Sequence, residues 1–306
     1  MGRSWLEAVR ATPLLFEPVP QGSRVNPARA EHHFESLVQL IQNVPRVDAV
    51  IIPELVDENH DGQPYYRSGD IRAFGQKIQE RTGREAIVNK VVAHLPDLDS
   101  VGAWAEETVR RGLKHAILVG GSSRYIPYPG PSVIEADARC RSVLQGAGGS
   151  LGNIAIPQRA GEAHRMLAKV RAGATYFTTQ IVFDSESVLK MLHDYDLLCR
   201  QSGLKPATVL LSLAPIGDET DAEFIRWLGG DFPEEAERSI LEGEESEAGA
   251  RSIKHALGIW SKLCEGVRSQ EITIPLGVNV EQLSQRNLPN AAAMLSAFAR
   301  ELPATT

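Results

Sequence analysis

Short apolar runs alternate with stretches of helical spacing along the whole chain, and this alternation most restricts the folds that the sequence can adopt. The runs are rich in Val, Ile, Leu and Thr, as buried strands are, and helical spacing follows each of them. Strands that alternate with helices favour a parallel sheet, because a crossover helix returns the chain to the same edge. The expected strands are Leu14–Val19, Val47–Pro53, Ala86–Ala93, His115–Val119, Gly152–Ile156, Thr175–Phe183, Thr208–Leu213 and Ile272–Val278.

Eight such units predict an α/β protein: a (βα)8 TIM barrel that forms a single domain over residues 1–306. The helical region Asp221–Gly266 is broken at Gly229–Pro233 and near Gly243, which predicts extra helices between the seventh and eighth strands. An open doubly wound sheet is the competing architecture. No GxGxxG turn joins the first strand to a helix, so a Rossmann dinucleotide site has no support.

Composition limits the classes of partner. The net charge is -7 and no predicted helix carries a basic cluster, which argues against nucleic acid as the main partner. No apolar run is long enough to span a membrane, and the N-terminus lacks the apolar core of a signal peptide. Three widely spaced cysteines suggest neither a disulfide framework nor a metal site. We therefore expect a cytoplasmic protein with no membrane partner, and the oligomeric state stays open.

The carboxyl ends of the expected strands carry the side chains that chemistry would use, since active sites of TIM barrels lie at that face. Two carboxylates, an imidazole and two amides converging there could bind and protonate a nitrogen-rich small molecule. The positions are Glu17, Glu54, His94, the Gly120–Gly121 turn, Pro157, Gln180 with Asp184, Pro215 and Asn279.

Each polar residue among these has a functional and a structural interpretation. Glu17 lies in an apolar strand, where low dielectric would raise its pKa and make it a general acid; it could instead cap backbone amides. Gln180 either faces a ligand or satisfies its amide against the backbone. Glu54 has the same two interpretations as Glu17, and His94 is either a site residue or a hydrogen-bonded structural histidine.

Two further features could serve a cofactor. The Gly120–Gly121 turn and the serines after it would let backbone amides approach a phosphate or a ring carbonyl, although many βα loops look alike. Lys169, one helical turn from Arg165, could reach a phosphate or stay solvated. The histidines lack the spacing of metal ligands, so no metal is expected.

Three motifs resemble the methylenetetrahydrofolate reductase family. FEPVP at Phe16–Pro20 is similar to that family's SFEFFPP, and AHLP at Ala93–Pro96 is similar to its PHLTC. AGATYFTTQIVFD at Ala172–Asp184 is similar to its AGADFxITQxFFD and is the most specific match. The order and spacing of the other strands extend the resemblance over nearly the whole chain.

The resemblance implies a (βα)8 oxidoreductase of one-carbon metabolism and methionine biosynthesis that reduces 5,10-methylenetetrahydrofolate to 5-methyltetrahydrofolate. Glu17 matches the glutamate that protonates the folate and opens its five-membered ring to a 5-iminium cation. Gln180 matches the glutamine that binds the pterin, and Asn279 is taken as a second substrate-binding amide. His94 matches a flavin-pocket histidine, and Lys169 matches a lysine near the FAD phosphates.

One departure bears on the cofactor. The family's fourth strand ends in LRGD, but here it reads LVGG, so Val119 and Gly121 replace the arginine and aspartate. FAD is therefore in doubt, and the chain also resembles the flavin-independent branch, in which NAD(P)H passes a hydride directly to the folate. Glu54 is the candidate to supply the missing negative charge. The alternatives are a tetrahydropterin-binding methyltransferase and a non-catalytic folate-binding paralogue.

Overall fold

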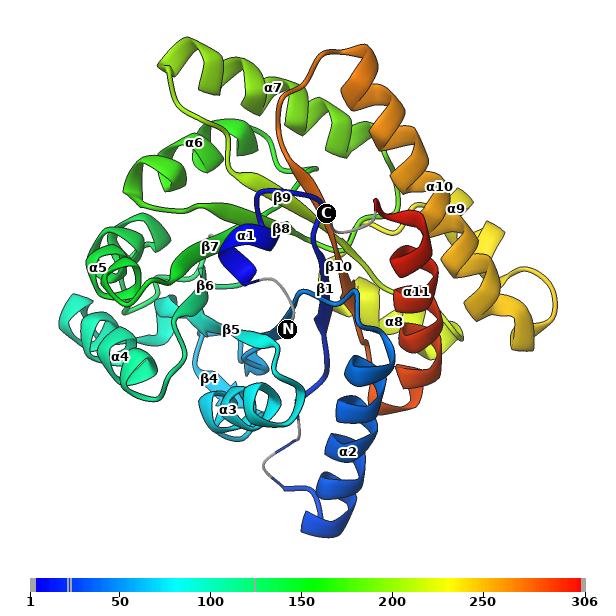
Figure 1. Ribbon diagram of the computed structural model, residues 1–306, viewed down its shortest axis with the longest axis horizontal. Helices are drawn as coiled ribbons and strands as arrows, with labels where there is room; N and C mark the ends of the chain where they lie inside the picture. Colours follow the sequence, from blue (N-terminus) through cyan, green and yellow to red (C-terminus); the bar gives the residue numbers. More distant parts are fainter. Residues whose placement is uncertain (1–3, 21, 23, 124, 304–306) are drawn as a thin grey trace.

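Parallel strands close into a barrel in the computed structural model, which describes residues 4–20, 22, 24–123 and 125–303 (Figure 1). Around the barrel the order is β1-β10-β9-β8-β7-β6-β5-β2, so each strand pairs with its neighbours along the chain and β10 closes onto β1. The predicted (βα)8 TIM barrel is confirmed. The strands are β1 (Leu14–Glu17), β2 (Ala49–Ile52), β5 (Glu85–Val91), β6 (His115–Val119), β7 (Ser150–Ala155), β8 (Tyr176–Thr179), β9 (Thr208–Leu213) and β10 (Leu276–Glu281).

Helices surround the barrel, and local signals set their ends. The Asn26 side chain accepts from the Ala28 amide at the start of α2, where Pro27 occupies the first turn. Ser132 and Glu135 form a capping box on α5, and Gly203 ends α7 at a φ of 63°. The surrounding helices are α2 (Pro27–Asn43), α3 (Ile71–Thr82), α4 (Leu98–Arg110), α5 (Val133–Gly146), α6 (Glu162–Ala172), α7 (Glu186–Ser202), α10 (Ala248–Ser269) and α11 (Leu288–Glu301).

Additional elements lie between the regular units. The extra helices expected after the seventh strand are present as α8 (Glu219–Trp227) and α9 (Glu234–Leu241), with a short 3-10 turn, η2 (Glu245–Glu247), before α10. Other short elements are α1 (Trp5–Ala8), η1 (Val92–His94) and η3 (Gln285–Asn287).

A hairpin replaces a predicted loop. Residues 57–69 were expected to form a polar loop, but β3 (Val56–Glu58) and β4 (Pro64–Tyr66) pair there as an antiparallel hairpin. Asn59 Oδ1 accepts hydrogen bonds from the amides of Asp61 and Gln63, so this side chain builds the turn.

The boundaries of the eighth barrel strand also differ from the prediction. The strand was expected over Ile272–Val278 with Asn279 at its end, but β10 runs from Leu276 to Glu281. Asn279 therefore lies inside the strand, and Glu281 ends it. The apolar residues before Pro275 pack beside α7, where Asp196 accepts from the Thr273 amide at 3.0 Å.

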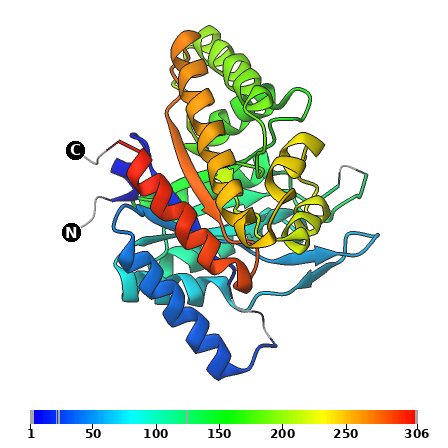
Figure 2. The ribbon, with the colours of Figure 1, turned by 90° about the vertical axis from the view of Figure 1, so that its right-hand side faces the viewer.

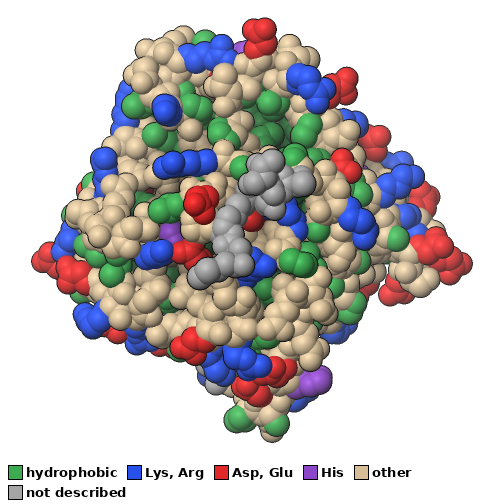
Figure 3. Space-filling view, in the orientation of Figure 1, with side chains coloured by type: hydrophobic (Ala, Val, Ile, Leu, Met, Phe, Trp, Pro, Cys, Tyr) green, Lys and Arg blue, Asp and Glu red, His purple; other side chains and the backbone are tan. Residues whose placement is uncertain are grey.

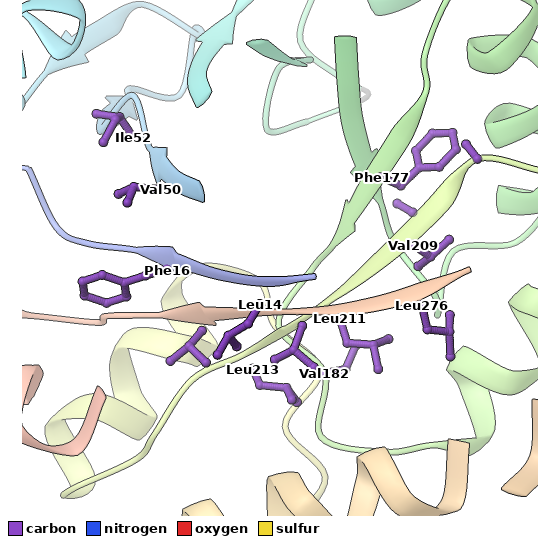
Figure 4. Close-up of a cluster of buried hydrophobic side chains, with 14 of the residues drawn as sticks. Leu14, Phe16, Val50, Ile52, Phe177, Val182, Val209, Leu211, Leu213 and Leu276 are labelled. Atoms are coloured by element: carbon purple, nitrogen blue, oxygen red, sulfur yellow. The ribbon is translucent and has the colours of Figure 1, made fainter. Parts of the chain in front are cut away.

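The apolar side chains form three layers. The largest lies between the barrel and its helices, and Figure 4 shows part of it, from Leu14 on β1 to Leu211 on β9. A smaller cluster fills the barrel interior, where α1 covers one opening with Trp5. A third cluster packs α8 and α9 against the chain after β8 and β9.

The two ends of the barrel differ. Figure 2 shows the chain termini on one side, and the β3–β4 hairpin with α8 and α9 on the other. On the face in Figure 3, acidic and basic side chains are interspersed. Within the described ranges, no helix has the length and apolar character needed to cross a bilayer.

Candidate active site at the carboxyl end of the barrel

The barrel interior changes from apolar to polar along its axis. Near the amino end, the inward side chains are Leu15, Ala49, Ile51, Ile87, Ile117, Tyr176 and Leu210. Side chains alternate between faces along a strand, so positions two residues further on also face inward. The polar residues at these positions, with those of β10 that are in register with β1, are Glu17, Asn89, Thr178, Ser212, Asn279 and Glu281. Val119 and Ile154 add apolar side chains, so the carboxyl end of the barrel is lined mainly by acids, amides and hydroxyls.

Glu17 and Glu281 lie side by side at this end. The register of β1 with β10 pairs the two residues directly. Asn279 Nδ2 donates to Glu17 Oε2 at 2.8 Å and to Ser212 Oγ at 3.1 Å, and it lies 3.4 Å from Glu281 Oε1. One amide nitrogen therefore orients both carboxyl groups. We name Glu17 and Glu281 the carboxyl pair.

The surroundings of the carboxyl pair favour the protonated form. Burial raises the pKa of Glu17 well above its usual value, and the neighbouring Glu281 charge raises it further, against the hydrogen bond from Asn279. Burial raises the pKa of Glu281 to about 7, while a hydrogen bond with Ser212 opposes the shift. The pair therefore retains a proton near neutral pH, as the general-acid interpretation of Glu17 requires.

Two inward-facing amide oxygens at the carboxyl end of the barrel lack a hydrogen-bond partner within the described residues. Asn279 is fully buried and its Oδ1 accepts no bond; Asn89, on β5, is 8% exposed and its Oδ1 is also unpaired. A buried polar group without a partner is uncommon, because it loses its bonds to water without replacement. Both oxygens can accept from a donor that enters the barrel end.

Gln180 lies at the barrel end but also has a backbone partner. It follows β8 on the inward face that carries Tyr176 and Thr178, and it is half-buried. Its Nε2 donates to the Leu228 carbonyl at 3.2 Å, just beyond α8. The structure thus contains the backbone bond of the structural interpretation, while the position suits a ligand contact.

Glu54 is held in an ion pair. Lys90 Nζ lies 2.6 Å from Glu54 Oε1, and the Val91 amide donates to Oε2 at 2.8 Å. Both side chains are 9% exposed, so little water screens the pair. The negative charge that Glu54 was expected to supply is therefore balanced by Lys90.

His94 belongs to a cluster that joins the hairpin to the loop after β6. Its Nε2 lies 2.7 Å from Glu58 Oε1 on β3. Glu58 Oε2 accepts from Ser122 Oγ and from Tyr128 Oη, each at 2.5 Å. We name His94, Glu58, Ser122 and Tyr128 the hairpin latch, because its bonds tie three segments together.

Tyr128 packs against one side of the Gly120–Gly121 turn. A Cβ atom at Gly121 would lie 2.1 Å from the Tyr128 ring, so only glycine leaves room for that ring. The Tyr128 hydroxyl also accepts from the Ser123 amide at 3.1 Å. Gly121 itself stays exposed, so the turn that was expected to approach a phosphate or ring carbonyl is packed on the Tyr128 side alone.

Lys169 is buried beside β7, neither solvated nor free to bind phosphate. Its Nζ donates to the Ile154 carbonyl at 2.7 Å, and the residue is 8% exposed. Burial lowers the pKa of Lys169, although nearby Glu162 opposes this. The ammonium group of Lys169, which matches a lysine near the FAD phosphates, is therefore committed to the backbone in this conformation.

Cavities elsewhere do not contain the carboxyl pair. One of about 210 Å³ lies between α2 and α3 and includes Phe34, Asp70 and Phe74. Another of about 710 Å³ lies beside α10 and the start of β10. In the part of the chain that the structure describes, no group of three or more His, Cys, Asp or Glu side chains is arranged to hold a metal.

Several site residues escaped the sequence analysis. Asn89 was a detectable signal, since it is an amide within the apolar run AIVNKVVA. Glu281 lies two residues beyond Asn279, so the period of a strand would have placed both on one face had the strand been extended to it. Glu58 lies on β3, and its contacts with residues far along the chain are encoded by no local pattern.

The comparisons with known proteins identify the fold. No protein-family model and no curated protein matches the sequence. Among solved structures, an uncharacterized protein from Clostridium thermocellum, described as binding two copies of 5-methyl-5,6,7,8-tetrahydrofolic acid, superposes with a TM-score of 0.77. The match covers 97% of this chain and 98% of that chain, at 18% sequence identity. At this identity the likeness supports the shared barrel fold alone.

Proposed function

We propose that this chain binds a reduced folate at the carboxyl end of the barrel and reduces 5,10-methylenetetrahydrofolate to 5-methyltetrahydrofolate with a hydride from NAD(P)H. The observation that carries the proposal is Glu17, a carboxyl on the inward face of the barrel that Asn279 orients and whose pKa is raised by burial. Opening the folate ring requires a positioned acid near neutral pH, which this environment supplies.

Two resemblances support a folate as the substrate. The segment Ala172–Asp184 is similar to the most specific motif of the methylenetetrahydrofolate reductases, and its Gln180 reaches the barrel end. The Clostridium thermocellum protein, with the same fold over 97% of this chain, is described as binding 5-methyltetrahydrofolic acid. Both support a pterin as the ligand, and the position of Gln180 supports the carboxyl end of the barrel as its site.

In the proposed reaction, the proton of Glu17 moves to N10 of the folate as the bond between N10 and the methylene carbon breaks. The electrons of that bond remain on N10, and N5 forms a double bond to the methylene carbon as an iminium cation. A hydride then adds to that carbon and completes the methyl group. Asn279 holds Glu17 in place, and the free amide oxygens of Asn89 and Asn279 can accept from N–H groups of the substrate.

We favour direct hydride transfer from NAD(P)H over transfer through FAD. Lys169, which matches a lysine near the FAD phosphates, is engaged with a backbone carbonyl. Val119 and Gly121 also stand where the family has an arginine and an aspartate, and both features argue against FAD. A nicotinamide needs only a flat approach to the bound folate, so the proposal does not depend on that phosphate site.

A tetrahydropterin-binding methyltransferase is the second candidate, and a non-catalytic folate-binding protein is its variant. One observation favours them: the compound described for the Clostridium thermocellum protein carries the methyl group already. Such a compound is the product of the reduction and also a methyl donor. Only turnover separates these functions.

The test combines an absorbance spectrum of the purified protein with NADH and NADPH oxidation in the presence of 5,10-methylenetetrahydrofolate. We expect no flavin band and folate-dependent oxidation of one nicotinamide. Glu17→Gln should lower turnover by about 10²–10⁴-fold while 5-methyltetrahydrofolate affinity stays within a few fold. The control Glu80→Gln changes an exposed residue on α3 and should leave both unchanged. Folate binding without nicotinamide oxidation would replace the reductase by the second candidate.

A further inference from the structure

The carboxyl pair has too few hydrogen-bond donors to be fully ionised. Asn279 Nδ2 donates to Glu17 and to Ser212 Oγ, and the Ser212 hydroxyl in turn donates to Glu281, so these donors leave most of the acceptor sites of the four carboxyl oxygens unfilled. Two adjacent, half-buried carboxylates repel each other, and the usual resolution is that they share a proton.

Among the residues that the structure describes, the elements around the carboxyl pair bring no compensating cation. Between β1 and β10 the titratable groups are Glu17 and Glu281 themselves, and β9 contributes the uncharged Ser212. On the other side of β1, β2 leads into Glu54, whose charge Lys90 balances. Helix α11, which also packs on β1 and β10, buries the apolar side chains Ala291, Met294, Leu295 and Phe298.

We propose that Glu17 and Glu281 hold one proton between them, so that Glu281 keeps Glu17 in its acid form and makes the pair doubly negative once that proton is given to the substrate. This inference rests on the proposed function for its chemical role. The fully buried, unpaired Oδ1 of Asn279, an independent feature, points to a ligand at the same place.

The pair then performs two tasks in sequence. Before the reaction, the charge on Glu281 disfavours ionisation of Glu17. When the proton passes to N10, both carboxyls are ionised beside the iminium cation, and their attraction stabilises it where little water screens the charges. After hydride addition the cation is gone, the repulsion returns, and a proton taken from water restores the pair.

Glu281→Gln tests this role through the pH profile of turnover. Without the Glu281 charge, Glu17 ionises more readily, so the alkaline loss of activity should move to lower pH by about 1 unit or more. Turnover should also fall at its optimum, because the neutral amide cannot stabilise the cation. An unchanged profile in an active Glu281→Gln variant would overturn the role of Glu281, whereas the proposed reduction would stand.

Thermal unfolding tests the shared proton without any reaction. A carboxyl whose folded pKa is raised loses folding stability as the pH rises from its unfolded value towards its folded value. Glu281→Gln removes that loss. The melting temperature of this variant, compared with that of the wild type, should therefore be higher at pH 8 than at pH 5. Glu17→Gln should behave alike, and the gains should not add in the double variant, because both remove one repulsion.

The two measurements separate the possible failures. A wild type without reductase activity, but with the pH-dependent gain in both variants, would overturn the proposed function and retain the shared proton. If the melting temperature of each variant differs from that of the wild type by the same amount at pH 5 and at pH 8, the shared proton is overturned, even if the protein reduces the folate. Glu80→Gln is the control and should follow the wild type at both pH values.

Discussion

Asn89 shows how a single residue can mark a binding site. It lies on the inward face of β5 with its Oδ1 buried and unpaired. Leaving such a group without a partner costs about 1–3 kcal/mol of folding free energy. Asn287 is also buried with an unpaired Oδ1, but its Nδ2 donates to the Pro215 carbonyl and to Asp221 Oδ2. Asn89 has no such bonds to the described residues and lies on the inward face of the barrel, so it is the amide suited to a ligand, while the Asn287 nitrogen holds the fold.

Opposite effects on stability are expected from the same substitution at these two sites. Asn89→Leu should leave the free energy of unfolding unchanged or raise it by about 1 kcal/mol, since it removes an unsatisfied group of similar size. It should weaken 5-methyltetrahydrofolate binding about tenfold, as measured by calorimetry. Asn287→Leu should lower the free energy of unfolding by about 1–3 kcal/mol. If Asn89→Leu also lowers the free energy of unfolding, Asn89 has a structural role and is not a ligand contact.

At the scale of elements, the β3–β4 hairpin depends on the hairpin latch for its position. A hairpin of this length is marginal by itself, so its contacts with the rest of the protein must hold it. Glu58 supplies them: its carboxylate receives two hydroxyl bonds and lies against His94. Arg67, just after β4, also lies 6.0 Å from the ring of Trp227 on α8. The hairpin therefore helps to enclose the barrel end.

Replacing Glu58 should release the hairpin. Glu58→Gln keeps the shape but loses the charge that strengthens the bonds from Ser122 and Tyr128. Limited proteolysis should cut residues 59–62 several-fold faster, and folate should protect against it. The control variant Asp61→Asn changes the exposed turn and should be cleaved at the wild-type rate. If Glu58→Gln is also cleaved at the wild-type rate, other contacts hold the hairpin.

Over the whole molecule, the two ends of the barrel have different tasks. At the amino end, α1 covers the interior: the Trp5 amide donates to Glu85 Oε2 at 2.5 Å, and Trp5 Nε1 donates to Ser150 Oγ at 2.9 Å. His115 lies between Ser150 and Glu85 and completes a buried network. These bonds contribute to stability, and the proposed chemistry lies at the other end.

Glu85 should therefore affect stability and not catalysis. The hydrogen bond with His115, with help from Lys114 and the Trp5 amide, lowers the pKa of Glu85 to about 2 against the effect of burial. A lowered folded pKa adds stability above the unfolded value of 4.5, and this stability is lost as the pH falls towards 2. Glu85→Gln should thus lower the melting temperature at pH 7 and much less at pH 3. Turnover at 25 °C should stay at the wild-type value.

The fold was predictable because it depends on patterns repeated along the chain. The alternation of apolar runs and helical spacing predicts the barrel, and the breaks near Gly229 and Gly243 predict the extra helices. Single elements were less predictable. The hairpin depends on a turn that the Asn59 side chain builds. The strand β10 was placed too early because the apolar run begins before the strand begins and ends before the strand ends.

By itself, the sequence determined the barrel and the polar residues that end its strands, since both follow from the alternation of side chains along the chain. Tertiary structure alone decided which of those residues share an environment. Strand register places Glu281 beside Glu17, while packing commits Glu54 to Lys90 and Lys169 to a carbonyl. The physical reason is that burial and the charge of a neighbour set the state of an ionisable group. Both depend on residues far apart in the sequence.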